Sequence, residues 1–185
     1  QKVYAPVHIY LNDGNGNLYE NSAVYYSNEA PTHPAPYRLA IADFNDDGID
    51  DIFVGSMGLQ YRDPDSNNDF ILPYPDLLLL SDSSGRFIDA SLNIDDQNNG
   101  NGKICGFSHD ASTGDFDNDG DYDIYACNLL LVNDGLGNFE IHQDLDFNLQ
   151  QAYGNPMSSL IVDLNNDNYA DLVFWNFDNR PNSIP

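Results

Sequence analysis

The stretch Gly114-Asp115-Phe116-Asp117-Asn118-Asp119-Gly120-Asp121-Tyr122-Asp123-Ile124-Tyr125-Ala126 joins an acidic loop to the start of an apolar run. Aspartates occupy every second position from 115 to 123, and Gly120 follows the third of them. A hard cation such as calcium takes about 6–8 oxygen ligands, and a short loop can supply them from alternate residues. Glycine suits the sharp turn because it adopts positive φ without steric cost. We therefore predict a calcium loop that leads directly into a strand.

Four side chains and one backbone carbonyl are the expected ligands in this central loop. The side chains are those of Asp115, Asp117, Asp119 and Asp123, and the carbonyl is that of Asp121. Carboxylate and carbonyl oxygens are the donors that calcium prefers in proteins.

The same spacing occurs twice more in the chain. In the first loop the expected ligands are Asp43, Asn45, Asp47, the Ile49 carbonyl and Asp51. In the third loop they are Asp163, Asn165, Asp167, the Tyr169 carbonyl and Asp171. The third loop has Asn168 in the place of glycine, and asparagine is among the residues that best tolerate positive φ. Plain Asp/Asn-rich turns are the alternative, and the threefold repetition argues against it.

A helical EF-hand loop is the main rival interpretation. It needs a bidentate acid at loop position 12, at the start of a helix. Position 12 is occupied here by Val54, Ala126 and Phe174, none of which can coordinate a metal. The residues after each loop are β-branched or aromatic and favour strands. We therefore exclude the EF-hand.

The chain of 185 residues has 30 acidic and 6 basic residues, which gives a formal net charge of -24. Three of the acids are glutamates and 27 are aspartates. Such an excess of aspartate, beside many asparagines and glycines, indicates turns and metal loops rather than acidity for solubility alone. Structural calcium in about three sites would leave a charge near -18. Because this field repels nucleic acids and anionic membranes, we exclude both as partners.

The composition also bears on the location of the protein. Hydrophobic residues make up 41% of the chain, too many for a disordered acidic tail, and no apolar run has the length of a membrane span. Cys105 and Cys127 flank the central loop, either as a disulfide or as two buried thiols. Extracellular calcium levels fill even weak sites, so we expect a secreted, extracellular or cell-surface protein. No secretory leader begins at Gln1, so we expect a secreted form to be mature or trimmed there.

Short apolar runs between turn residues predict an all-β fold, and no convincing amphipathic helix is present. We expect strands on either side of each acidic loop, and hairpins around the turns at 12–17, 81–85 and 133–138. The first hairpin should pair residues 3–11, interrupted by Pro6, with a returning strand over 18–26. Irregular loops or linkers are expected over 28–37, 56–76, 93–103 and 142–157.

Two modules thus alternate along the chain. One is strand, acidic loop, strand; the other is a hairpin such as Leu130–Phe139, of the form Leu-Leu-X-Asn-Asp-Gly-X-Gly-Asn-Phe. One of each makes four antiparallel strands, the size of a β-propeller blade. We expect a single domain over 1–185 with about three blade-equivalents: a half blade 3–27, blades 38–90 and 104–141, and a half blade 158–178.

Three segments resemble the FG-GAP/VCBS repeat of integrin-α-like β-propellers: Ala42–Gly55, Gly114–Ala126 with Leu129–Ile141, and Val162–Trp175. The resemblance covers most of the chain and implies calcium in the loop between the first two strands of each blade. Two features depart from the family pattern: the insertion at 56–76, and the small number of blades where the family typically makes seven.

The halves at the two ends complement each other. The chain begins with a hairpin that lacks an acidic module and ends with an acidic module that lacks a hairpin. Closure of a three-bladed ring would be very tight. The alternatives are a piece of a larger propeller, or pairing of the ends between chains, which would give a filament if it did not close.

Three function classes follow. An enzyme is not expected: His109-Asp110 is a conceivable catalytic pair, but no nucleophile elbow, phosphate loop or zinc cluster is present, so we assign no catalytic residue. A recognition module would use Tyr61, Arg62 and Tyr74 in the 56–76 loop to bind carbohydrate or protein. A structural subunit would self-associate by strand pairing, with calcium stiffening the turns. The split blade favours the subunit.

Overall fold

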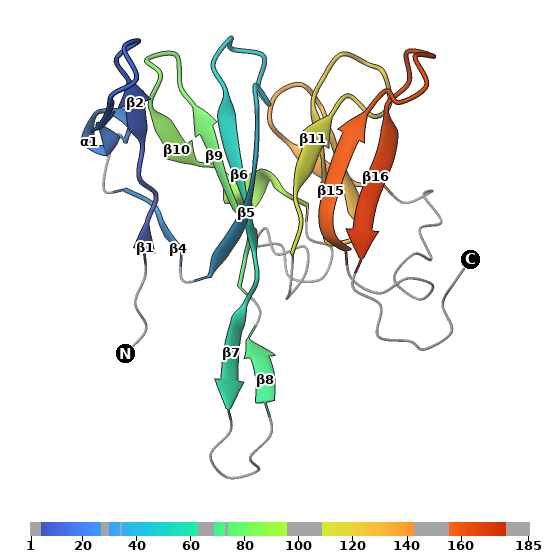
Figure 1. The fold of residues 1–185 in the computed structure, drawn as a ribbon, viewed down its shortest axis with the longest axis horizontal. Helices are drawn as coiled ribbons and strands as arrows, with labels where there is room; N and C mark the ends of the chain where they lie inside the picture. Colours follow the sequence, from blue (N-terminus) through green and yellow to red (C-terminus); the bar gives the residue numbers. More distant parts are fainter. Residues whose placement is uncertain are drawn as a thin grey trace.

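The computed structural model describes residues 5–26, 30–33, 35–62, 69–72, 74–95, 109–142 and 156–176 (Figure 1). The regular structure of these residues is mostly β-strand, and they form two antiparallel four-stranded sheets and four two-stranded pairs. The sequence-based assignment to the all-β class is therefore confirmed. None of the sheets formed by the described strands closes on itself.

The two four-stranded sheets each consist of an acidic-loop module followed by a hairpin. Sheet A has the order β10-β9-β6-β5 and contains β5 (Pro36–Ala42), β6 (Asp51–Ser56), β9 (Leu77–Ser81) and β10 (Phe87–Asp89). Sheet B has the order β11-β12-β13-β14 and contains β11 (Ser112–Gly114), β12 (Asp123–Ala126), β13 (Leu129–Asn133) and β14 (Phe139–Ile141).

The remaining strands form pairs. The last acidic loop joins β15 (Pro156–Val162) to β16 (Asp171–Asn176), and the first hairpin joins β2 (Tyr10–Asn12) to β3 (Leu18–Glu20). The other pairs are β1 (Ala5–Pro6) with β4 (Thr32–His33), and β7 (Leu59–Arg62) with β8 (Asp69–Leu72). Two short helical turns, α1 (Ser22–Tyr25) and η1 (Ser91–Asn93), each follow a hairpin.

The sheets stand in a row, face against face, because their strands are apolar on both sides. Along β6, Phe53 faces sheet B, whereas Val54 packs toward the first hairpin. Along β12, Ile124 faces sheet A, whereas Tyr125 packs against the β15–β16 pair. Successive side chains of a strand point to opposite faces, so each central strand contributes to two neighbouring cores.

The first strands of the modules contact one another: β5 lies beside β11, and β11 lies beside β15. The fit of β11 to β15 is close, since a Cβ added at Gly114 would lie 2.5 Å from Ile161 Cγ2. One edge strand of each sheet thus meets the corresponding strand of its neighbour. The three acidic loops lie along one side of the row, at the top in Figure 1, and the β7–β8 hairpin projects from the opposite side.

Several boundaries differ from the sequence-based expectations. The returning strand expected over 18–26 ends at Glu20, because the chain turns into α1. The irregular loop expected over 56–76 contains the β7–β8 ladder, whose alternation of apolar and polar residues is short. The linker expected over 28–37 contains β4 and the start of β5. Much of the loops expected over 93–103 and 142–157 lies outside the described residues.

Candidate metal centre

The three acidic loops share one backbone conformation, held by the side chain of the first aspartate. The Oδ2 atom of that residue accepts a hydrogen bond from the backbone N–H five positions later. The three bonds are Gly48 N to Asp43 at 2.7 Å, Gly120 N to Asp115 at 3.1 Å, and Asn168 N to Asp163 at 2.9 Å. This bond folds each loop back on itself, and the acidic side chains lie along the edge of the folded loop.

The next two expected ligands of each loop fold back in the same way. Their Oδ1 atoms accept N–H bonds from the residue two positions on, as in Asp119 N to Asp117 at 3.3 Å and Asp121 N to Asp119 at 3.0 Å. In the first loop Asn45 and Asp47 do the same, as do Asn165 and Asp167 in the third. Such side-chain turns are typical of Asp and Asn.

Positive φ occurs where the sequence predicts it, at Gly48 (86°), Gly120 (103°) and Asn168 (70°). It also occurs two residues earlier in each loop, where the sequence analysis missed it. The residues concerned are Asp46 (56°), Asn118 (65°) and Asn166 (59°). Asp and Asn are the non-glycine residues that enter this region most readily, so their recurrence at this position was the available signal.

The last aspartate of each loop fastens the loop to the sheet. Asp51 is fully buried, and its two oxygens accept Phe44 N at 2.7 Å and Ser81 N at 2.6 Å. Asp123 is equally buried and accepts Phe116 N at 2.8 Å and Asn133 N at 2.9 Å. Thus one carboxylate ties the loop to the last residue of the first strand in the following hairpin. The sequence analysis assigned these residues only as metal ligands and did not anticipate this second role.

The third loop has only half of this fastening. Asp171 Oδ2 accepts Leu164 N at 3.0 Å, as its counterparts do. Within the described part of the chain, no third strand pairs with β16 and no hydrogen bond reaches Asp171 Oδ1. Asp171 is also less buried than Asp51 and Asp123.

The central loop brings together three of its predicted ligands. Carboxylate oxygens of Asp115, Asp117 and Asp123 all lie within 4.8 Å of one another, a grouping that the described residues contain nowhere else. The first and third loops have asparagine at the second ligand position, and so have fewer acids to group. Asp119 and Asp121 lie in the same loop but outside this group.

The electrostatics of this group suit a cation. Asp115 Oδ1 is buried and has no hydrogen-bond partner among the residues that the structure describes. Burial raises the pKa of Asp123 to about 6, and burial together with the Asp119 charge raises the pKa of Asp117. Carboxylates held close without a counter-charge resist ionisation, and a divalent cation reverses this effect. The residues therefore fit calcium, which would neutralise them in their ionised form.

The His109-Asp110 pair lies between the sheets. Asp110 is fully buried, and its Oδ1 accepts Cys127 N at 3.1 Å, while burial raises its pKa to about 6. The His109 ring lies 4.8 Å from the Tyr37 ring, and Arg38 Nε donates to the His109 carbonyl at 3.2 Å. Burial lowers the pKa of His109. These contacts join β5 to the segment before β11.

Cys127 is disulfide-bonded, which decides between the bond and the thiol alternatives for this residue. Cys105, the other cysteine of the sequence, lies outside the described residues. Both Cys127 and Asn128 have positive φ, so the turn between β12 and β13 is tight.

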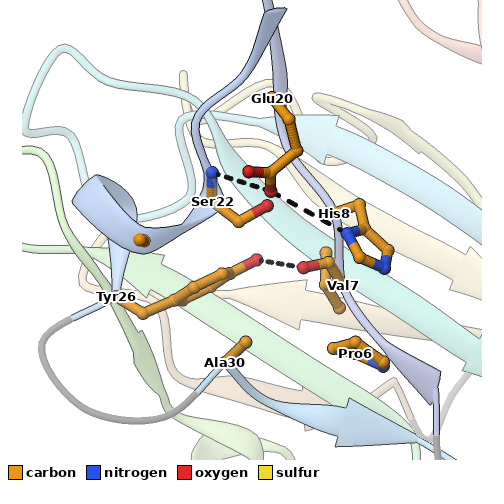
Figure 2. A pocket seen from close by; sticks show the side chains of 8 residues that line it. Pro6, Val7, His8, Glu20, Ser22, Tyr26 and Ala30 are labelled. Atoms are coloured by element: carbon orange, nitrogen blue, oxygen red, sulfur yellow. Dashed lines mark hydrogen bonds and ion pairs between the residues drawn. The ribbon is translucent and has the colours of Figure 1, made fainter.

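A pocket of 340 Å³ lies beside the first hairpin (Figure 2). Tyr26 borders it and donates from its hydroxyl to the Val7 carbonyl at 3.2 Å. His8 Nδ1 lies 3.8 Å from Glu20 Oε1 on the opposite side, and Glu20 Oε1 accepts Ser22 N at 3.1 Å. The polar groups that line the pocket are thus largely engaged with one another.

The three residues named for recognition in the sequence analysis all lie in the described part of the chain. Tyr61 and Arg62 end β7 on the projecting hairpin, and Arg62 is exposed. Tyr74 instead packs its ring edge against His33, at 6.3 Å between centroids. The structure therefore separates Tyr74 from the projecting part of this segment.

Comparison with known proteins identifies one family. Residues 3–54 match the model of the FG-GAP-like repeat, which confirms the resemblance seen in the first acidic loop and extends it to the first hairpin. No curated protein and no solved structure matches the chain. Among the described residues, no helix has the length and apolar character needed to span a membrane.

Proposed function

We propose that this chain, which contains an FG-GAP-like repeat over residues 3–54, is an extracellular calcium-binding structural protein. Its acidic loops hold calcium, which fixes the ends of the sheets, and copies of the chain associate by strand pairing. The calcium is structural rather than catalytic, and we propose no enzymatic activity.

The grouping of Asp115, Asp117 and Asp123 within 4.8 Å carries this proposal. Three carboxylates at such distances repel one another strongly unless a cation lies among them. The hydrogen bonds common to the three loops extend the proposal to the first and third loops, where calcium would meet one amide oxygen in place of a carboxylate.

Calorimetric titration with calcium, alongside thermal melting in calcium and in chelator, tests the proposal. We expect calcium to bind and to raise the melting temperature. Asp115→Asn and Asp119→Ala should each weaken calcium binding and lower the melting temperature in calcium, because each removes a carboxylate from the central loop. Asp13→Asn is a matched control for the charge, because Asp13 lies in the turn between β2 and β3. Identical melting curves in calcium and chelator would contradict structural calcium.

A recognition or adhesion module is the second candidate. The β7–β8 hairpin favours it, since this ladder projects beyond the sheets on the end opposite the acidic loops (Figure 1). Such a position suits contact with carbohydrate or protein. Replacing residues 59–72 with a short Gly-Ser turn should abolish binding on a glycan or cell-surface array while leaving the melting temperature in calcium unchanged. Unaltered array binding would exclude the hairpin as the binding element.

A further inference from the structure

The first hairpin has the structure of the second half of a four-stranded sheet. Ile9 N donates to Ser22 Oγ at 2.8 Å, just as Leu78 N in sheet A donates to Ser91 Oγ at 3.1 Å. The carbonyls of Ile9 and Leu78 also accept equivalent backbone bonds, from Asn21 N and Ala90 N. The β2–β3 hairpin with α1 thus repeats the β9–β10 hairpin with η1.

The connection from each of these hairpins to the next sheet is also the same. After α1, Tyr26 forms a parallel bridge to Phe87 at the start of β10. After η1, Ile94 forms the same bridge to Phe139 at the start of β14. Each hairpin is therefore placed before its neighbour in one fixed way, and β2–β3 occupies a regular position ahead of sheet A.

In sheets A and B the hairpin is held by one recurring contact. The last residue of the third strand, Ser81 or Asn133, donates its N–H to Oδ1 of the last loop aspartate. The residue at this position in the first hairpin is Asn12, which pairs with Leu18 as Asn133 pairs with Phe139. The matching acceptor is Asp171 Oδ1, which has no partner among the described residues.

The geometry points to an interface in which β2 of a second copy of this chain pairs antiparallel with β16. The Asn12 N–H of one copy then donates to Asp171 Oδ1 of the other. The registers of β6 with β9 and of β12 with β13 place Tyr10 opposite Leu172 and Ile9 opposite Val173. This inference deepens the self-association in the proposed function and rests on it.

The apolar surfaces of the two ends agree with this docking. On β5, the exposed fractions of Leu39 and Ile41 are 56% and 52%. Both side chains lie on the face of sheet A that is turned toward the first hairpin, which does not cover them. On β15 and β16, Leu160 is 54% and Trp175 is 77% exposed, on the face away from sheet B. When β16 pairs with β2 of the second copy, the β15–β16 pair lies next to β5 of that copy. The exposed apolar surface of β15 and β16 then contacts the exposed apolar surface of β5. Burial of paired apolar surfaces supplies the driving force.

For residues 1–185, the docking also predicts the number of copies. The described strands of each copy supply sheets A and B, and each contact between copies completes one further four-stranded sheet. Two copies joined at both contacts therefore make a closed ring of about six blades, within the usual range of about four to eight. A contact between two different surfaces gives a closed ring when its repeated rotation leads back to the first copy. Here two copies complete the ring, so the assembly is a dimer with two-fold symmetry.

Light scattering with size-exclusion chromatography, in calcium, tests the assembly. We expect a single species of twice the chain mass of 20.6 kDa. Trp175→Asp and Leu39→Asp should each give a monomer, since each places a charge in the interface on a residue exposed in the single chain. Leu136→Asp is the control, because Leu136 is 69% exposed in the turn between β13 and β14 and should leave the dimer intact. A monomeric or open-ended wild type would overturn the proposal.

Cross-linking tests the register. Mixed Tyr10→Cys and Leu172→Cys proteins should form a disulfide dimer on mild oxidation. Tyr10→Cys mixed with Val173→Cys should not, because adjacent residues of a strand point to opposite faces. Equal cross-linking in both mixtures would refute the register.

Calcium titration of Trp175→Asp separates the two proposals. Calcium binding by a monomeric variant, together with a wild type that is also monomeric, would leave structural calcium standing and remove the interface. A wild-type dimer that binds no calcium would leave the interface standing and remove structural calcium.

Discussion

Individual aspartates perform three different tasks in this protein, and their surroundings decide which. Asp115 and Asp117 lie at the loop rim and are suited to a cation. Asp51 is buried and is satisfied by two backbone N–H groups. Asp110 is buried between sheets beside a disulfide-bonded cysteine. At Asp110 burial favours the protonated carboxyl more strongly than the Arg38 charge opposes it, so this group makes stability depend on pH.

The pH dependence of Asp110 has a definite sign. Its pKa is raised from 3.8 to about 6 in the folded protein, so the folded state holds the proton more tightly than the unfolded state. This group therefore favours folding below its unfolded pKa, and that contribution is lost as pH rises through about 6. Asp110→Asn keeps an acceptor for Cys127 N and removes the titration. We expect the variant to gain about 1–3 kcal/mol over wild type between pH 4 and pH 7, measured by urea unfolding. A pH-independent difference would contradict the assignment.

At the scale of elements, the acidic module and the hairpin form one unit because a single carboxylate spans them. Asp123 joins β12, the loop and the end of β13, and Asn133 Nδ2 extends the link by donating to the Phe44 carbonyl in the first acidic loop at 2.8 Å. The loops are thus part of the sheet structure before any metal binds. This is why hairpin and loop recur together along the chain.

Replacing Asp51 or Asp171, which occupy equivalent positions in their loops, by alanine should lower the free energy of unfolding by different amounts. Asp51→Ala leaves two buried N–H groups without acceptors, and we expect a loss of about 2–4 kcal/mol in chelator. Asp171→Ala leaves one such group in a more exposed loop, so the expected loss is below about 1.5 kcal/mol. Urea unfolding of both variants at neutral pH measures the difference. Equal losses would show that the bonds of Asp51 do not fasten the sheet.

At the scale of the whole molecule, charge opposes both folding and association. The formal net charge is -24, and the three acidic loops concentrate part of it along one side of the row of sheets. Bound calcium lowers this repulsion locally, while salt screens it in general. The proposed dimer brings two such chains together, so calcium should favour it.

The effect of calcium on the melting temperature should therefore become smaller as the salt concentration rises. In chelator, raising the sodium chloride concentration to about 0.5 M should increase the melting temperature by screening the loop aspartates. In calcium the same addition should have a smaller effect, because the charges are already neutralised. Scanning calorimetry at two salt concentrations measures both. A salt effect that is equal in calcium and chelator would indicate that calcium does not neutralise the loops.

The sequence determined the local structure of this protein. The alternation of aspartates, the residues suited to positive φ and the apolar runs after each loop were enough to predict the loops, their flanking strands and the FG-GAP-like repeat. These features depend on residues within a few positions of one another, where the preferences of Asp, Asn and Gly for turns act directly.

Only the tertiary structure decided how these pieces combine. The end of the strand at Glu20, the β7–β8 ladder and the fastening of loop to hairpin by Asp51 and Asp123 depend on contacts between distant residues. The same holds for the unmatched Asp171 and the exposed faces around Leu39 and Trp175. A side chain's burial and its hydrogen-bond partners are set by the packing of whole sheets, which local preference does not encode.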